Sequence, residues 1–277
     1  VPFRDKWVLT EQALESLLRQ QLQGIEVLVA MVDNGSAEPN TLAGIADFQR
    51  REVAHLRFRH LRYEIPFNYS RLNNLAVVDC ADFAPDHLLL LNNDVILTDL
   101  HTLSQMCAFL EANPSCGSVG CTLLYPSGYL QHLYIDIGCV IVGAHPFRGK
   151  RHRPNDPWFQ SPRPVGAATA ALLMLPAAVF RAMSGFDEQL SHSFQDIDLA
   201  LKLQAAGYVN WVLPLLPAIH HETQSRPKAF DWTEVDLVTS RWGRCLTANP
   251  YTSPRFSRWS ETPAISLGEG VLPWHHL

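Results

Sequence analysis

The 277-residue sequence lacks the features that mark several special classes of protein. Its formal net charge of −5 provides no general basic face, so we expect no nucleic-acid partner. No apolar run approaches the roughly 20 residues that a membrane-spanning helix needs, and no signal peptide is visible. The six cysteines show no CxxC pair or metal-type spacing, which favours a reduced, cytoplasmic protein.

What is present is typical of a globular enzyme. Hydrophobic residues make up 47% and charged residues 18% of the chain, which suits a large buried core. The opening Val1-Pro2-Phe3 reads as the end of a strand whose beginning is missing, so we expect a piece of a larger multidomain protein. The Pro- and Ser-rich tail over residues 251–277 carries no functional signal and is expected to lead toward a further domain.

Helix-like and strand-like patterns alternate along the first half of the chain. The predicted helices span residues 10–22, 40–51 and 69–80, and the predicted strands span residues 25–32, 56–63 and 87–91. This order implies right-handed crossovers and a mostly parallel sheet, in which ligands bind at the carboxyl ends of the strands. Asp33 and Asp94 both fall at that edge.

The second half is less regular. The predicted strands span residues 119–125, 135–142 and 208–213, and the predicted helices span residues 176–184, 195–206 and 232–242. A Pro- and Arg-rich loop, residues 145–164, includes a basic cluster at residues 148–153. That cluster is either a solvated loop or a site for phosphates or anionic lipid.

Acidic residues at strand and helix ends are the candidates for chemistry. Asp94 follows a buried strand, where a carboxylate is a hard ligand for Mg²⁺ or Mn²⁺, although Asn92-Asn93-Asp94 also suits a simple turn. The Asp33 turn has the same two readings. Asp196 and Asp198 begin a helix, where a carboxylate acts either as a cap or as a general base. His220 follows a strand and is a further candidate ligand.

Taken in order, the motifs resemble the inverting glycosyltransferases of family 2, of the bacterial polysaccharide or O-antigen type. The resemblance covers residues 1–250 and rests on an ordered set of short matches. These are Pro2-Phe3-Arg4-Asp5-Lys6, Val32-Asp33-Asn34-Gly35-Ser36, Phe67-Asn68-Tyr69-Ser70-Arg71-Leu72-Asn73-Asn74, Leu91-Asn92-Asn93-Asp94-Val95, Gly185-Phe186-Asp187-Glu188, Gln195-Asp196-Ile197-Asp198-Leu199 and His220-His221-Glu222-Thr223-Gln224-Ser225-Arg226.

The resemblance implies the GT-A fold, with a nucleotide-sugar half over residues 1–120 and an acceptor half over residues 121–250. It also implies a role for each matching residue. Nucleotide binding falls to Pro2, Asp33, Asn74 and Asn93, the metal ligands are Asp94 and His220, the general base is Asp196, and the acceptor contacts are Trp158, Ala167 and Asp198. Trp158 is a candidate for stacking on a sugar, with ordinary packing as the alternative.

The implied reaction is a metal-dependent transfer, using Mn²⁺ or Mg²⁺, of a sugar from a nucleotide diphosphate sugar to a glycan or lipid-linked glycan. UDP is the commonest nucleotide expected from the resemblance, and dTDP and GDP stay open. The implied location is the cytoplasm, either free or peripheral at the inner face of the plasma membrane. Which sugar is transferred and which linkage forms are not encoded in any motif of the sequence.

Two departures from the family pattern leave alternatives open. Asn92 replaces the first acid of the DxD motif, and Gln195 replaces the acid that usually precedes the base. These changes give some support to a degenerate, carbohydrate-binding module. A sugar nucleotidyltransferase is a second alternative, but it is expected to have a glycine-rich phosphate loop near the first strand. The turn Pro2-Phe3-Arg4-Asp5-Lys6 has no glycine.

Overall fold

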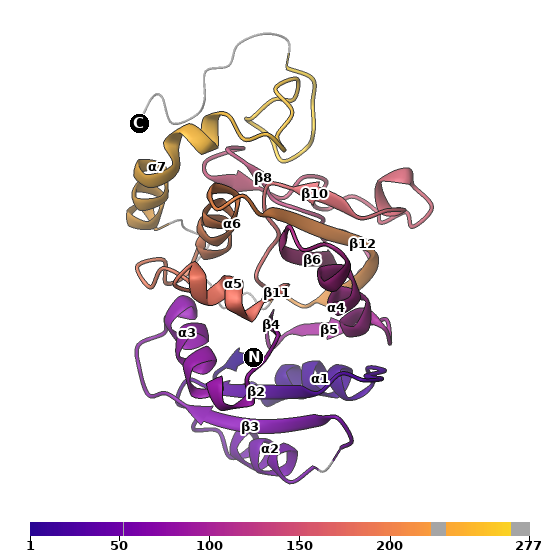
Figure 1. The fold of residues 1–277 in the computed structure, drawn as a ribbon, viewed down its shortest axis with the longest axis vertical. Coiled ribbons are helices and arrows are strands. Elements are labelled where there is room, and N and C mark those ends of the chain that lie inside the picture. The colour runs from indigo at the N-terminus through magenta and orange to yellow at the C-terminus, as the bar shows by residue number, and fades with distance from the viewer. Residues whose placement is uncertain (52, 223–230, 267–277) are drawn as a thin grey trace.

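The computed structural model describes residues 1–51, 53–222 and 231–266. Figure 1 shows a small sheet with its helices at the N-terminal, indigo end of the molecule and a larger sheet beyond it. The small sheet consists of β1 (Pro2–Phe3), β2 (Val27–Asp33) and β3 (Leu56–Arg62), all parallel. The prediction of a parallel sheet in this part of the chain is confirmed.

Alternate side chains of β2 face two different layers, as a strand buried on both faces requires. Val29 and Met31 pack with residues of α1 (Trp7–Leu18) and α2 (Pro39–Gln49). Val32 packs instead with residues of α3 (Tyr69–Asp79), where Leu72 is fully buried. Helices on both faces therefore leave only the ends of these strands open, and the carboxyl ends carry Asp33.

The larger sheet has seven strands. Its order is β10 (Arg163–Val165), β12 (Val209–His220), β6 (Cys116–Leu124), β11 (Leu172–Pro176) and β4 (His87–Leu91), with β5 (Val95–Leu97) on β12 and β7 (Leu130–His132) on β6. Only the β6–β12 pairing is parallel, and the other pairings are antiparallel. The sheet is therefore mixed, because β11 runs back along β4 rather than entering through a crossover.

The remaining helices are the 3-10 helix η1 (Ala81–Phe83), α4 (Thr102–Ala112), the 3-10 helix η2 (Pro157–Phe159), α5 (Ala177–Ala182), α6 (Gln195–Ala205) and α7 (Trp232–Thr247). Four of them, α4, α5, α6 and η2, contact the larger sheet, while α7 packs on α6 and η1 on α3. A two-stranded ribbon, β8 (Asp136–Ile137) with β9 (Gly143–Ala144), lies apart from the larger sheet. No helix of the described chain is long and apolar enough to cross a membrane.

The boundaries expected at residues 120 and 251 both fall in packed parts of the structure. The expected division at residue 120 falls inside β6, so the two halves share the large sheet. The tail that begins at residue 251 packs back on the domain within its described part. Thr252 Oγ1 donates to the Ile137 carbonyl at 3.0 Å, and the Arg258 guanidinium donates to the Leu246 carbonyl at 3.1 Å. Residues 267–277 lie outside the described residues.

Candidate active site

Asp33 is fully buried at the carboxyl end of β2, and three neighbours hold its carboxylate. Its Oδ1 accepts from the Ser36 backbone N–H at 2.7 Å, and its Oδ2 accepts from Arg62 at 2.7 Å with His60 Nε2 at 3.3 Å. Burial acts to raise the pKa of Asp33, but the hydrogen bonds from Ser36, with His60 and Arg62, hold that pKa below its usual value. The side chain is therefore an anion that fixes the turn after β2. Arg62 was not among the predicted site residues.

Asp94 and His220 lie against each other because β5 begins directly after Asp94 and pairs with the end of β12. Val95 is opposite His220 in this pairing, and the Asp94 carbonyl accepts from the His221 N–H at 3.0 Å. The Asp94 carboxylate and His220 Nε2 are 3.1 Å apart, and both side chains are largely buried. The structure thus brings together the two residues predicted to hold a metal.

The hydrogen bonds of Gln131 determine which nitrogen of His220 faces Asp94. Gln131 Nε2 donates to the Glu222 carboxylate at 3.1 Å, so its amide oxygen faces His220 Nδ1 at 2.6 Å. An amide oxygen can only accept, so Nδ1 carries a proton and Nε2 is the nitrogen that faces the Asp94 carboxylate. A ring nitrogen and a carboxylate oxygen at this separation can bind the same cation. This chemistry fits a divalent metal, and the outer hydrogen bond is of the kind that orients metal-bound histidines.

The described residues contain no group of three or more His, Cys, Asp or Glu side chains that could hold a metal. Asp94 and His220 therefore fit as two ligands of an open site, the kind in which Mg²⁺ keeps waters and substrate phosphates. Thr223, Gln224, Ser225 and Arg226 of the matching motif lie outside the described residues. So does the rest of the segment 223–230.

Asp196 occupies the first turn of α6 and faces the segment between β10 and β11. Its Oδ2 accepts from the Ala170 N–H at 3.3 Å, and its Oδ1 accepts from the Ile197 N–H at 2.9 Å. Burial raises the pKa of Asp196 above its usual value, and the hydrogen bonds from Ala170, Ile197 and the Thr169 side chain limit this rise. A carboxylate with a raised pKa is a stronger base than an exposed one.

The segment of residues 169–171 joins the base to the metal pair. On one side the Ala170 N–H donates to Asp196, and on the other the Ala171 carbonyl accepts from the Asn92 N–H at 2.9 Å. Asn92 lies two residues before Asp94 at the end of β4. The predicted base and the predicted metal ligands are therefore linked through this one segment.

Asn74 and Asn93, which are predicted to bind the nucleotide, form hydrogen bonds within the protein. The Asn74 amide accepts from the Phe186 N–H at 3.0 Å and donates to the Phe186 carbonyl at 2.9 Å, so it clamps the turn before α6 to α3. Asn93 Nδ2 donates to Thr10 Oγ1 at 2.9 Å and ties the Asp94 turn to α1. Both amides thus make hydrogen bonds that join parts of the scaffold. Pro2 is buried in β1 beside Val32.

Two of the predicted acceptor residues have no access to an acceptor in this structure. Ala167 is fully buried, and its carbonyl accepts from the Ile135 N–H at 2.8 Å. Asp198 is also fully buried, and it binds Arg241 at 2.6 Å, Trp242 Nε1 at 2.8 Å and Lys202 at 2.9 Å. Asp198 therefore anchors α7 on α6, and a contact with the acceptor stays a prediction.

Trp158 remains a candidate for stacking on a sugar because it is 45% exposed. Its ring lies 5.8 Å from that of Phe147, and the Arg163 guanidinium lies 4.6 Å from its centroid. These contacts hold one face of the indole and leave part of the ring open. Within the described chain, Lys150 and Arg153 of the nearby basic cluster form no ion pair.

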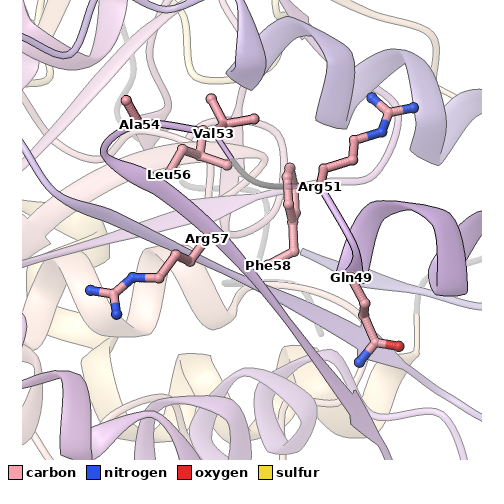
Figure 2. A pocket seen from close by; sticks show the side chains of 7 residues that line it. All are labelled: Gln49, Arg51, Val53, Ala54, Leu56, Arg57 and Phe58. Atoms are coloured by element: carbon pink, nitrogen blue, oxygen red, sulfur yellow. The ribbon is translucent and has the colours of Figure 1, made fainter.

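Figure 2 shows a surface pocket lined by Gln49, Arg51, Val53, Ala54, Leu56, Arg57 and Phe58. It lies at the start of β3, whereas Asp33 and Arg62 lie at the other end of the same pair of strands. In Figure 2 the side chains of Arg51 and Arg57 point away from each other. None of the predicted site residues lines this pocket, so it has no part in the candidate active site.

The chain is similar in sequence to several known proteins. No protein-family model matches the chain. The uncharacterized protein y4gI of Sinorhizobium fredii is 35% identical over 267 residues, and the O-antigen biosynthesis protein RfbC of Myxococcus xanthus is 32% identical over 266 residues. Each alignment covers 93% of this chain but only 28% and 20% of the respective relative, so the chain matches a part of much longer proteins.

A third relative has a similar length to this chain. The N-acetylglucosaminyl-diphospho-decaprenol L-rhamnosyltransferase of Mycobacterium tuberculosis is 25% identical over 230 residues, which cover 78% of this chain and 72% of that enzyme.

Solved structures share the fold. GalNAc-T7 with UDP, GalNAc and Mn²⁺ aligns with a TM-score of 0.62 and 10% identity, covering 86% of this chain and 46% of that one. The mannosyltransferase of Pyrobaculum calidifontis with GDP-Man and Mn²⁺ aligns with a TM-score of 0.58 and 15% identity, covering 90% and 64%. The chain therefore has the GT-A fold of these solved structures, as the resemblance implied, and in sequence it is similar to an O-antigen biosynthesis protein and to a rhamnosyltransferase.

Proposed function

We propose that the chain transfers a sugar from a nucleotide diphosphate sugar to a hydroxyl of a glycan or lipid-linked glycan, with inversion at the anomeric carbon. The observation that carries the proposal is the pair Asp94–His220, joined through residues 169–171 to Asp196. A metal-binding pair and a base with a raised pKa in one site are the two elements that such a displacement needs.

The donor site lies at the carboxyl edge where β2 and β4 end. Asp33 supports its nucleotide end, because the turn that it fixes through Ser36 presents backbone groups there. UDP is the nucleotide we propose, with dTDP and GDP as the alternatives. Asp94 and His220 would hold Mn²⁺ or Mg²⁺, and such an ion neutralises charge on a leaving diphosphate.

Asp196 is proposed as the general base. Its carboxylate takes the proton of the acceptor hydroxyl as the new bond from that oxygen to the anomeric carbon forms. The bond between the anomeric carbon and the diphosphate oxygen breaks on the opposite face, and the nucleotide diphosphate leaves with the electron pair. The hydrogen bonds from Ala170 and Ile197 hold the carboxylate in place for this step.

We propose that the acceptor reaches this site past the loop of residues 145–164. Trp158 supplies an exposed aromatic surface of the kind that stacks on sugar rings. The cluster Arg148, Lys150, Arg151 and Arg153 has one short-range acidic partner among the described residues, Glu261, which lies 3.8 Å from Arg148. This surplus of positive charge suits a lipid-linked acceptor with phosphate groups, presented at the inner face of the plasma membrane.

Turnover of donor by purified protein tests the proposal. With Mn²⁺ and each of UDP-, dTDP- and GDP-sugars, we expect slow donor hydrolysis that Asp196→Ala and Asp94→Ala abolish, while Asp236→Ala on the exposed side of α7 leaves it unchanged. NMR of the transfer product should show an inverted anomeric configuration. Binding of a nucleotide sugar without turnover under any acceptor would contradict the enzyme and favour the carbohydrate-binding alternative.

A further inference from the structure

Strand β7 lies between the two halves of the candidate site and carries two adjacent polar side chains. It pairs antiparallel with β6, and all three of its residues are buried. Gln131 is 5% exposed and His132 is 1% exposed. Buried polar groups need hydrogen-bond partners, and neighbouring residues of a strand point to opposite sides. The two side chains therefore reach two different parts of the site.

Gln131 reaches the metal pair. Its amide oxygen lies 2.6 Å from His220 Nδ1, while its amide nitrogen is held by Glu222 at 3.1 Å. The Glu222 contact prevents the amide from turning over, because a carboxylate cannot donate to the amide oxygen. Gln131 thus selects the tautomer of His220 that directs Nε2 toward Asp94.

His132 reaches the segment beside the base. Its Nε2 accepts from the Thr169 backbone N–H at 3.3 Å, so that nitrogen has no proton. The proton of the neutral ring is then on Nδ1, which lies 2.8 Å from His145 Nδ1. His145 Nδ1 is accordingly an acceptor. The two rings form a directed chain, from the Thr169 N–H through His132 to His145.

The Thr169 N–H belongs to the residue before Ala170, whose own N–H donates to Asp196 at 3.3 Å. These two neighbouring amides point to different partners, so the orientation of one peptide constrains the other. Residues 169–171 contain no helix or strand that would hold them otherwise. Burial keeps both histidines neutral, since it lowers the pKa of His132 well below its usual value and that of His145 to about 3.

We propose that β7 is a positioning element for catalysis, in which Gln131 orients the metal ligand His220 and His132 orients the base Asp196 through residues 169–171. Neither side chain is a catalytic residue. Both ring nitrogens of His132 are engaged, and its side chain has almost no exposed surface for a substrate. The inference rests on the proposed function, because it assigns the partners of that same site.

Two substitutions at His132 separate its two hydrogen bonds. In His132→Gln the amide oxygen takes the place of Nε2 and still accepts from Thr169. In His132→Asn the amide takes the place of Nδ1, so the contact with His145 is kept and the acceptor for Thr169 is lost. We expect His132→Asn to lower kcat about ten- to hundred-fold, the size of effect expected from a small misplacement of a catalytic group. KM for the donor and the Mn²⁺ concentration for half activity should stay unchanged.

His132→Gln should retain most of the wild-type kcat. The acid limb of the pH–rate profile should also move to higher pH in His132→Asn, because the hydrogen bonds from Ala170 and Thr169 lower the pKa of Asp196 and this variant loosens them. If His132→Asn does not fold, His145→Phe removes the acceptor for His132 Nδ1–H from a less buried position. A fall in kcat at unchanged KM is expected there as well.

Substitution of Gln131 gives the reciprocal result. Gln131→Met removes the acceptor for His220 Nδ1–H at similar volume. We expect Mn²⁺ affinity, measured by isothermal titration calorimetry, to fall about ten- to hundred-fold, as for other outer partners of metal ligands. The kcat at saturating Mn²⁺ should be retained. Each variant therefore serves as the control for the other.

The outcomes distinguish this inference from the proposed function. If the wild-type chain has no turnover, the proposed function fails, and β7 is then tested by calorimetry and by ¹³C titration of the Asp196 carboxyl. A higher Asp196 pKa in His132→Asn than in His132→Gln supports the inference, and equal values overturn it. If the wild type is active but both His132 variants match it, or if Gln131→Met and His132→Asn lower kcat and metal affinity alike, the inference is wrong.

Discussion

Asp33 and Asp196 are two carboxylates whose surroundings shift their pKa values in opposite directions. Burial acts to raise both values, but Asp33 also receives a backbone hydrogen bond from Ser36 and the charge of Arg62. Asp196 has hydrogen bonds from neutral donors and no cationic partner among its leading influences, so burial prevails. An anion kept ionised and a carboxylate made more basic are suited to different tasks.

The first prediction concerns Asp196→Asn. The change should lower kcat about 10²- to 10⁴-fold, because it removes the carboxylate that we propose as the general base. It should not reduce stability at pH 7. The folded-state pKa of Asp196 is raised, so the charged form costs stability at neutral pH, and that cost disappears as the pH falls through the raised pKa. Urea unfolding at pH 7 and pH 4 measures this. A large loss of stability at pH 7 would contradict the assigned environment.

The second prediction concerns Gly185, whose φ is +67° and whose added Cβ would lie 2.5 Å from Asn74 Oδ1. Gly185→Ala should destabilise the protein more than Gly128→Ala. Gly128 also has a positive φ, of +80°, but its added Cβ would meet nothing within 4 Å. Both changes cost backbone strain of about 1 kcal/mol, and the difference between them isolates the Asn74 clamp. Equal urea midpoints for the two variants would show that the clamp is unimportant.

A candidate site residue can be predicted from sequence where its side chain stands at the end of an apolar strand. Asp33, Asp94 and His220 all follow that rule. Asn74 and Asp198 could not be assigned in the same way, because their partners, Phe186 and Arg241, are distant in sequence. The only sign of Gln131 and His132 in the sequence is that they are two adjacent polar residues. The structure places both in β7, where all three residues are buried.

At the scale of elements, His132 in β7 and His145 directly after β9 make the stability of the fold sensitive to acid. Burial, with nearby positive groups, lowers the pKa values of His132 and His145. The unfolded chain takes up these protons below about pH 6.5, whereas the folded chain does not. The free energy of unfolding should therefore fall as the pH falls below that value, by about 1.4 kcal/mol per pH unit for each histidine.

This third prediction is measured by urea unfolding between pH 7.5 and pH 5. His145→Asn should show a smaller slope than the wild type, because it has one such histidine fewer. His87→Asn, at a partly exposed position in β4, is the matched control. A wild-type stability that does not change across this range would contradict the buried neutral pair.

Helices and strands were predictable where the apolar residues follow one uninterrupted pattern, as in β2 and α6. Helix α4 was not predicted, although its buried Leu103, Met106 and Leu110 follow a helical spacing. The antiparallel pairing of β11 with β4 was also missed. A run of apolar residues that is buried on both faces has no pattern that reveals the direction of its neighbour.

At the scale of the whole molecule, the candidate site combines residues from the two halves of the chain. Asp94 comes from the first half, Asp196 and His220 come from the second, and residues 169–171 join them. Sequence order predicted that all three belong to one family pattern, but not which backbone segment lies between them. That arrangement depends on the mixed sheet, whose order is set by long-range pairing.

The fourth prediction concerns the basic cluster as a membrane contact. The domain should bind vesicles of phosphatidylglycerol and phosphatidylcholine more strongly than pure phosphatidylcholine, and salt should weaken the binding. Replacing Lys150, Arg151 and Arg153 by Gln should lower this binding roughly a hundred-fold, at about 1 kcal/mol for each basic residue. Equal binding to both vesicles, or no effect of the substitutions, would show that the cluster is a solvated loop.

The most direct test of the central claim is a thermal-shift titration with UDP, dTDP and GDP, with and without Mn²⁺. A bound ligand raises the melting temperature by mass action. We predict that at least one nucleotide gives a shift in the wild type and that this shift requires Mn²⁺. Asp196→Ala should show an equal shift, and Asp94→Ala should show none. A shift that is independent of Mn²⁺, or one that Asp94→Ala retains in full, would contradict the assignment of Asp94 and His220 to a metal site.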